Sequence, residues 1–69
     1  MIPKYISEAI SKIDPQANQR HVFGYMLLPG YRFGDMTARK MNSEIRLSIA
    51  CIKEGGVDAA ERNAKSFGL

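Results

Sequence analysis

The 69-residue sequence has a single cysteine, Cys51, and no tryptophan. One cysteine excludes an internal disulfide, and with His21 as the only histidine it also excludes the common multi-cysteine zinc sites. We therefore expect no metal and no cofactor. A domain of this size has a core that supplies only about 3–5 kcal/mol of net stability, so disulfides, metals or self-association usually support it. Without the first two supports, the sequence predicts a homo-oligomer or a partner-bound chain.

A long apolar run is also missing, since no uninterrupted one is longer than that of residues 25–28. A membrane-spanning helix needs roughly 18–20 apolar residues, so no membrane partner is expected. The N-terminus has no signal-peptide pattern, because only Lys4 precedes a polar, helical-looking stretch. A single unpaired thiol suits a reducing compartment. These features together predict a cytoplasmic protein.

The residue sets that catalysis needs are sparse. A nucleophilic triad needs a base beside a nucleophile and a third group that orients the base, whereas His21 has mainly apolar or aromatic sequence neighbours. We predict that His21 is a structural or surface residue, with a binding contact as the alternative. The carboxylates are scattered singly, and the glycines match no phosphate-binding spacing, so we interpret them as turn and cap residues. The chain is predicted to be no enzyme and to have no catalytic residue.

Apolar residues with helical spacing are plentiful at the N-terminus. Isoleucines at positions 2, 6, 10 and 13 predict a helix over residues 3–13, which Asp14 and Pro15 interrupt. Asp14 can then cap a second helix over residues 16–28. Alternatively, β-forming residues followed by the turn pair Pro29–Gly30 predict a hairpin at about residues 21–33. The returning strand of that hairpin is very short, so the helix is favoured.

Two further helices are predicted in the second half of the chain. The first begins at an N-cap, Asp35 or Thr37, and continues to about residue 54 with a buried stripe of Ala38, Met41, Ile45, Ser48, Ile49 and Ile52. Gly55–Gly56 ends it, and a fourth helix follows at about residues 57–66. The small apolar face of this helix consists of Val57, Ala60, Ala64 and Phe67.

The alanines of the last helix allow another helix to approach closely, so we expect these two helices to pack as an antiparallel hairpin. The sequence thus predicts a mainly α fold, a small single-domain helical bundle of three to four short helices over residues 1–69. If residues 21–33 form a hairpin, the alternative is an α+β domain.

The charges indicate where a partner could bind. Lys and Arg number 10 against 7 Asp and Glu, a net charge of +3. Arg39, Arg46 and Lys53 repeat every seven residues, so they form a row on the third predicted helix, about 100–160° from its buried stripe. Such a row can meet phosphates or an acidic protein surface, or it can be an ordinary solvated face.

The segment 24–33 combines Tyr, Met, Arg and Phe between glycines, a composition that interface hot spots favour. The same residues could instead complete the core. Asp35, at the head of the third helix, would place this segment beside the basic row. The candidate partner-binding residues are therefore Tyr25, Tyr31, Arg32, Phe33, Arg39, Arg46 and Lys53.

The C-terminal sequence is similar to a known motif. Residues 55–62, Gly-Gly-Val-Asp-Ala-Ala-Glu-Arg, followed by Phe67, Gly68 and Leu69, resemble the first helix and turn of bacterial helix-turn-helix domains of the factor-for-inversion type. The resemblance implies a small-residue helix that leads through a Gly-Leu turn to a recognition helix. Because the sequence given stops at Leu69, where that helix begins, we expect no DNA recognition from this motif. In size and composition the chain is also similar to small phage-encoded inhibitors of host machinery.

Three functional hypotheses result. The leading one is a small non-enzymatic interaction protein, an inhibitor, adaptor or regulator that binds a larger macromolecule, with a protein partner favoured. The second is a basic nucleic-acid-binding regulator, whose basic row is flanked by phosphate contacts from Arg20, Arg32, Lys40, Arg62 or Lys65. The third is a helical oligomer that holds a small anionic ligand between subunits, in contact with Tyr25, Tyr31 or Arg32.

Overall fold

Four α-helices make up most of the computed structural model, which describes residues 2–27 and 33–69. They are joined partly by a 3₁₀ turn, η1, and by a π-helical turn, η2. The elements are α1 (Lys4–Ile13), α2 (Gln19–Met26), η1 (Phe33–Asp35), α3 (Ala38–Cys51), η2 (Ile52–Gly56) and α4 (Val57–Ser66). No strand occurs in the described residues. The predicted mainly α bundle of three to four short helices is confirmed.

The start of α2 differs from the prediction, because Asn18 and not Asp14 is its N-cap. The Asn18 side chain accepts a hydrogen bond from the backbone N–H of His21, 3.1 Å away. Asp14 instead closes α1 with its own N–H, and its carboxylate accepts a bond of 3.0 Å from the N–H of Gln16. The Asp14 side chain therefore stabilises the turn that precedes α2 and does not cap α2 itself.

The segment from Gln19 to Met26 is helical, so the favoured helix is confirmed there and the hairpin alternative is wrong. Val22, Phe23 and Met26 are buried on one side of α2. Their burial in the core outweighs the β propensity of the segment. Tyr31 and Arg32, on the predicted returning strand, lie outside the described residues, and Phe33 begins η1.

The third helix begins at Thr37, whose side chain accepts a 3.2 Å hydrogen bond from the N–H of Lys40. Asp35, the other candidate cap, lies in η1. The α-helix ends at Cys51 and widens into η2, in which Gly55 breaks the helical conformation with a φ of +114°. The predicted glycine stop is confirmed, because this backbone conformation strongly favours glycine.

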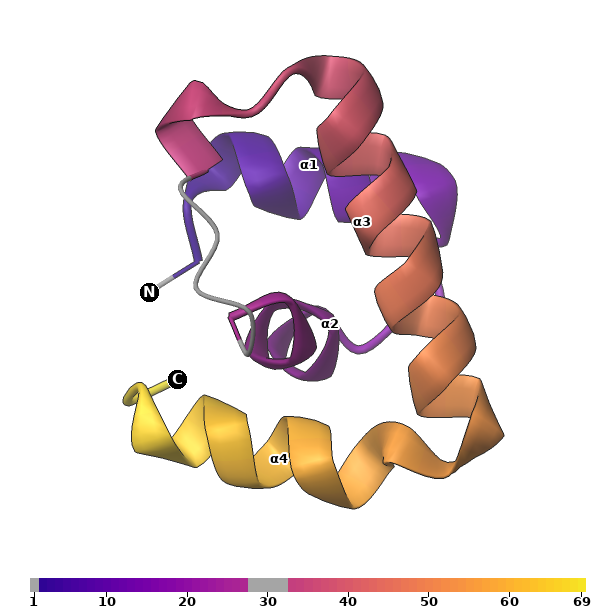
Figure 1. The fold of residues 1–69 in the computed structure, drawn as a ribbon, viewed down its shortest axis with the longest axis vertical. Helices are drawn as coiled ribbons and strands as arrows, with labels where there is room; N and C mark the ends of the chain where they lie inside the picture. Colours follow the sequence, from indigo (N-terminus) through magenta and orange to yellow (C-terminus); the bar gives the residue numbers. More distant parts are fainter. Residues whose placement is uncertain (1, 28–32) are drawn as a thin grey trace.

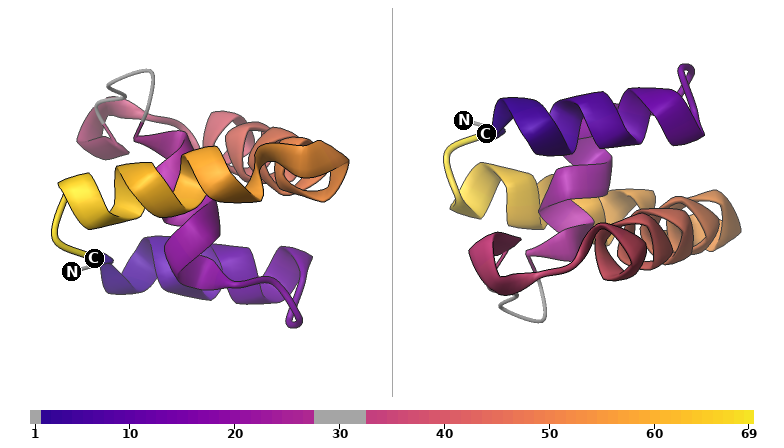
Figure 2. Two further views of the ribbon diagram at one scale, coloured as in Figure 1. Left: turned by 90° about the horizontal axis from the view of Figure 1, so that it is seen from below. Right: turned by 90° about the horizontal axis from the view of Figure 1, so that it is seen from above.

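The core is built around α2, which contacts α1, α3 and α4 (Figure 1). Figure 2 shows α2 crossing between α1 and α4. The buried cluster consists of Ile6, Ile10, Val22, Phe23, Met26, Met41 and Ile45. The predicted stripe of α3 supplies the last two of these together with the buried Ser48, whereas Ala38 is exposed.

The predicted antiparallel hairpin of the last two helices is wrong, because α4 packs chiefly on α2. Gly24 lies in the interior of α2, so the interpretation of this glycine as a turn or cap residue is also wrong. A Cβ at Gly24 would lie 2.8 Å from the Ala60 carbonyl oxygen and 3.0 Å from the Ala64 Cβ. The small residues thus let the backbones of α2 and α4 approach closely.

This close approach buries only part of the predicted apolar face of α4. Ala60 and Ala64 are fully buried, whereas Val57 and Phe67 at its two ends are 42% and 56% exposed. The Asn63 side chain adds a hydrogen bond to the Gly24 carbonyl oxygen. Contact between α4 and α2 is therefore closest along the line of small residues.

Candidate interaction surface

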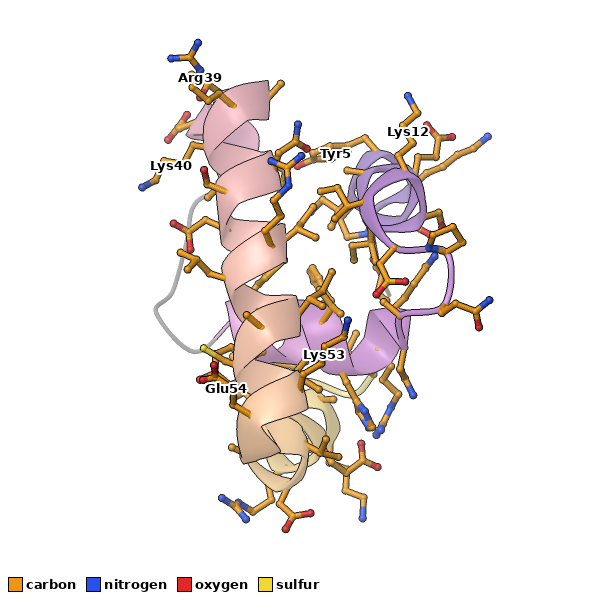
Figure 3. All side chains as sticks on the ribbon, turned by 90° about the vertical axis from the view of Figure 1, so that its right-hand side faces the viewer. Tyr5, Lys12, Arg39, Lys40, Lys53 and Glu54 are labelled. Atoms are coloured by element: carbon orange, nitrogen blue, oxygen red, sulfur yellow. The ribbon has the colours of Figure 1, made fainter. Side chains whose placement is uncertain are left out.

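The basic row of α3 and η2 is exposed along its length. Arg39 lies in the first turn of α3, Arg46 lies at its middle, and Lys53 follows in η2. Figure 3 looks onto the molecule from this side and shows Lys53 over the space between α3 and the end of α1. The Lys53 Nζ is 3.9 Å from Asp14 Oδ2, but the lysine side chain is 72% exposed, so the ion pair contributes little to stability.

A groove runs along one side of α3, formed by adjoining hollows that share lining residues. Its opposite wall is the side of α1 that carries Tyr5 and Lys12 (Figure 3), together with the connection from α1 to α2. We call it the α3 groove. The wall on α3 and η2 consists of Ala38, Asn42, Arg46, Ile49, Ala50 and Lys53. The facing wall includes Tyr5, Glu8, Ala9, Lys12, Ile13 and Asp14.

One end of the groove is a pocket of about 320 Å³, which we call the Ile52 pocket. Its apolar lining comes from Ala17, Val22, Ile49 and Ile52. Its polar lining comes from Asp14, Gln16, Asn18, His21 and Lys53. The side chain of Asp14 accepts a hydrogen bond from a backbone N–H of the connection, and that of Asn18 accepts one from the first turn of α2, so both rim residues are tied to the backbone.

Arg20 and His21, in the first turn of α2, make contacts within the fold. Glu61 of α4 accepts a hydrogen bond from the Arg20 guanidinium, and its Oε2 lies 3.3 Å from His21 Nε2. Arg20 Nε also donates to the Leu69 carbonyl oxygen at 2.8 Å. Arg20, a predicted phosphate contact, thus ties α2 to α4, and Lys40, another, lies 3.7 Å from Glu44. Arg62 and Lys65 are exposed on α4.

Tyr25 lies away from the basic row. Its hydroxyl hydrogen-bonds with Cys51, and this bond, the charge of the thiolate form of Cys51 and burial raise the pKa of Tyr25 above 10.0. Cys51 is about 120–160° around the helix from the three basic residues. Tyr25 therefore does not lie beside the basic row, where the sequence placed it. Tyr31 and Arg32 fall outside the described residues, and Phe33 is placed as the first residue of η1.

The contribution of α1 to this surface was not predicted from the sequence. Tyr5 is 53% exposed and lines the groove with Ala9 and Lys12. These positions share one side of a helix at a spacing of four and three residues, which was a detectable signal. The isoleucine stripe of the same helix predicts only its buried side.

The chain has no match among known protein families, characterised proteins or solved structures. The helix-turn-helix resemblance is therefore unsupported at the level of family. Its local elements are present, since α4 ends in a turn at Gly68, with a φ of +73° and a 2.9 Å bond from the Leu69 N–H to the Ala64 carbonyl. Within residues 2–27 and 33–69, no helix is long and apolar enough to cross a membrane.

Proposed function

We propose that this protein is a non-enzymatic interaction module, an inhibitor, adaptor or regulator, that binds a larger protein through the α3 groove. The observation that carries the proposal is the combination of apolar and cationic side chains in one concave surface. Ile13, Ile49 and Ile52 supply the apolar lining, and Arg46 and Lys53 stand at its edge. Apolar centres with a charged rim are typical of protein interfaces.

A protein partner is favoured over nucleic acid for two reasons. Phosphate contacts need cations but gain little from an apolar lining, whereas Val22, Ile49 and Ile52 line the pocket at one end of this groove. In addition, Arg20 and Lys40 face carboxylates of their own chain. A cytoplasmic location is part of the proposal, because the free thiol of Cys51 suits a reducing compartment.

Site-specific cross-linking tests the proposal. We expect a photoreactive benzoylphenylalanine at position 50, in the groove, to give a discrete protein adduct in cells that produce the chain. The same amino acid at position 62, exposed on α4 and away from the groove, serves as the matched control and should not give that adduct. Adducts are measured by gel shift and mass spectrometry.

The outcome that contradicts a protein partner is an adduct at position 50 that nuclease removes. Equal protein adducts from positions 50 and 62 would also contradict the groove as the binding surface. Either result is distinguishable from a folding defect, because both positions are exposed and circular dichroism reports the helices directly.

Self-association is proposed on a different surface. Leu47 is 60% exposed on α3 and lines none of the hollows of the groove. We expect a dimer or larger assembly at high micromolar concentration, because an isolated core of this size is marginal. The substitution Leu47→Glu should shift sedimentation equilibrium toward the monomer. A parent chain that sediments as a monomer at these concentrations contradicts the proposal.

A further inference from the structure

The α3 groove has the dimensions of a binding site for one helix. Its wall on α3 and η2 is regular, since Ala38, Asn42, Arg46, Ile49 and Lys53 recur at helical spacing. Fifteen residues of helical rise give a wall about 22 Å long. A partner helix of about four turns could lie along this wall, with the end of α1 on its other side.

The middle of the groove carries uncompensated positive charge. Lys12 and Arg46 line the same hollow on opposite walls, and neither has a carboxylate within 4 Å among the described residues. Glu8 is the acidic residue of this hollow. Farther along, Asp14 already faces Lys53. A negative charge on the partner would therefore be attracted to the space between Lys12 and Arg46.

The Ile52 pocket adds an apolar anchor point. Its volume of about 320 Å³ can take a bulky side chain, and its apolar lining can shield that side chain from water. The lining from Val22, Ile49 and Ile52 belongs to three different elements of the fold, α2, α3 and η2. The pocket therefore forms only in the folded chain.

We propose that the α3 groove binds an acidic amphipathic helix of a partner protein, with a bulky apolar side chain in the Ile52 pocket and a carboxylate between Lys12 and Arg46. This inference rests on the proposed function and names the class of partner. Helices recognised in grooves present apolar anchors at spacings of three or four residues, which fits the Ile52 pocket at one end and the apolar side chains of Ala9, Ile13 and Ala38 farther along the groove.

A second copy of this chain fits the groove less well. The chain carries a net charge of +3, so a second copy brings net charge of the same sign to the cations of the groove. Nucleic acid supplies negative charge but no aliphatic side chain for the Ile52 pocket. An acidic helix satisfies both requirements.

The test is selection from a phage-displayed library of 18-residue peptides on the immobilised full chain, with counter-selection on the variant Ala50→Trp. Ala50 is exposed on the groove wall, so a tryptophan there obstructs binding without entering the core. Ser66→Trp, on the exposed end of α4, is the matched control. We expect the enriched peptides to carry net negative charge and bulky apolar residues three or four positions apart.

A synthetic peptide of the enriched type should become helical on binding, as measured by circular dichroism. Its affinity should fall about tenfold or more for the double variant Lys12→Glu/Arg46→Glu. The double variant Arg62→Glu/Lys65→Glu changes the net charge equally but on α4, and should alter the affinity less than about twofold.

The inference is overturned if no peptide is enriched, if enriched peptides are neutral or basic, or if the two double variants weaken binding equally. A loss of binding to Ser66→Trp as large as the loss to Ala50→Trp overturns it as well. A protein adduct at position 50 together with any of these results leaves the proposed function standing and rejects only the acidic helix. A nuclease-sensitive adduct rejects the proposed function itself.

Discussion

The substitution Gly24→Val is expected to remove most of the stability of the fold. A Cβ at this position would meet the Ala60 carbonyl oxygen at 2.8 Å, and backbone atoms cannot move aside as the end of a side chain can. Overpacking usually costs about 1–3 kcal/mol, and the better helix propensity of valine offsets only a few tenths. We expect a loss of at least about 2 kcal/mol, out of the roughly 3–5 kcal/mol typical of such a domain.

The same change at Gly34 is the matched control. No described atom lies within 4 Å of a Cβ built there, and the φ of Gly34 is not positive. Gly34→Val should therefore unfold in urea at nearly the same midpoint as the parent, whereas Gly24→Val should unfold at a much lower one. If the two variants unfold alike, close approach of α2 and α4 at Gly24 is not what holds α4 in place.

The positions of the helices could be predicted because each is determined by local chemistry. Isoleucine spacing locates α1, Thr37 caps α3, and Gly55 breaks the helix after α3 in a conformation that strongly favours glycine. These signals depend on neighbouring residues in sequence. They contain no information about which helices meet in space, so the bounds of α3 and α4 were nearly right while their packing was wrong.

The partner of α4 could not be identified from its own sequence. Ala60 and Ala64 indicate that some helix approaches closely, but both α2 and α3 were available. The missing clue was Gly24, a small residue inside a helix that was interpreted as a turn residue. A glycine on one helix and alanines four residues apart on another are complementary surfaces, and their match determines the packing.

The candidate site was likewise only partly predictable from the sequence. That Arg46 and Lys53 are exposed followed from the periodicity of α3 alone. The groove beside them did not, because it exists only where α1 and the connection after it approach α3. Tyr25 was a candidate because of the composition of residues 24–33. Its contact with Cys51 could not be predicted, because it depends on how α2 packs against α3.

The substitution Ile45→Ala should also destabilise the fold severely. Ile45 is fully buried in the cluster that joins α3 to α1 and α2. Truncation of a buried isoleucine to alanine removes apolar contacts and leaves a cavity, at a cost of about 2–5 kcal/mol. Chemical denaturation followed by circular dichroism should show a lower midpoint with little change in slope.

Leu47→Ala is the matched control for this prediction, since it removes a similar aliphatic side chain two positions away on the same helix. Leu47 is 60% exposed, so its truncation should change the monomer's stability by less than about 0.5 kcal/mol. The comparison is best made at a concentration where the chain is monomeric, because Leu47 is also the residue proposed for self-association. If Ile45→Ala unfolds within a few tenths of a kcal/mol of Leu47→Ala, α3 presents a different side to the core, and the groove built on that orientation is misplaced as well.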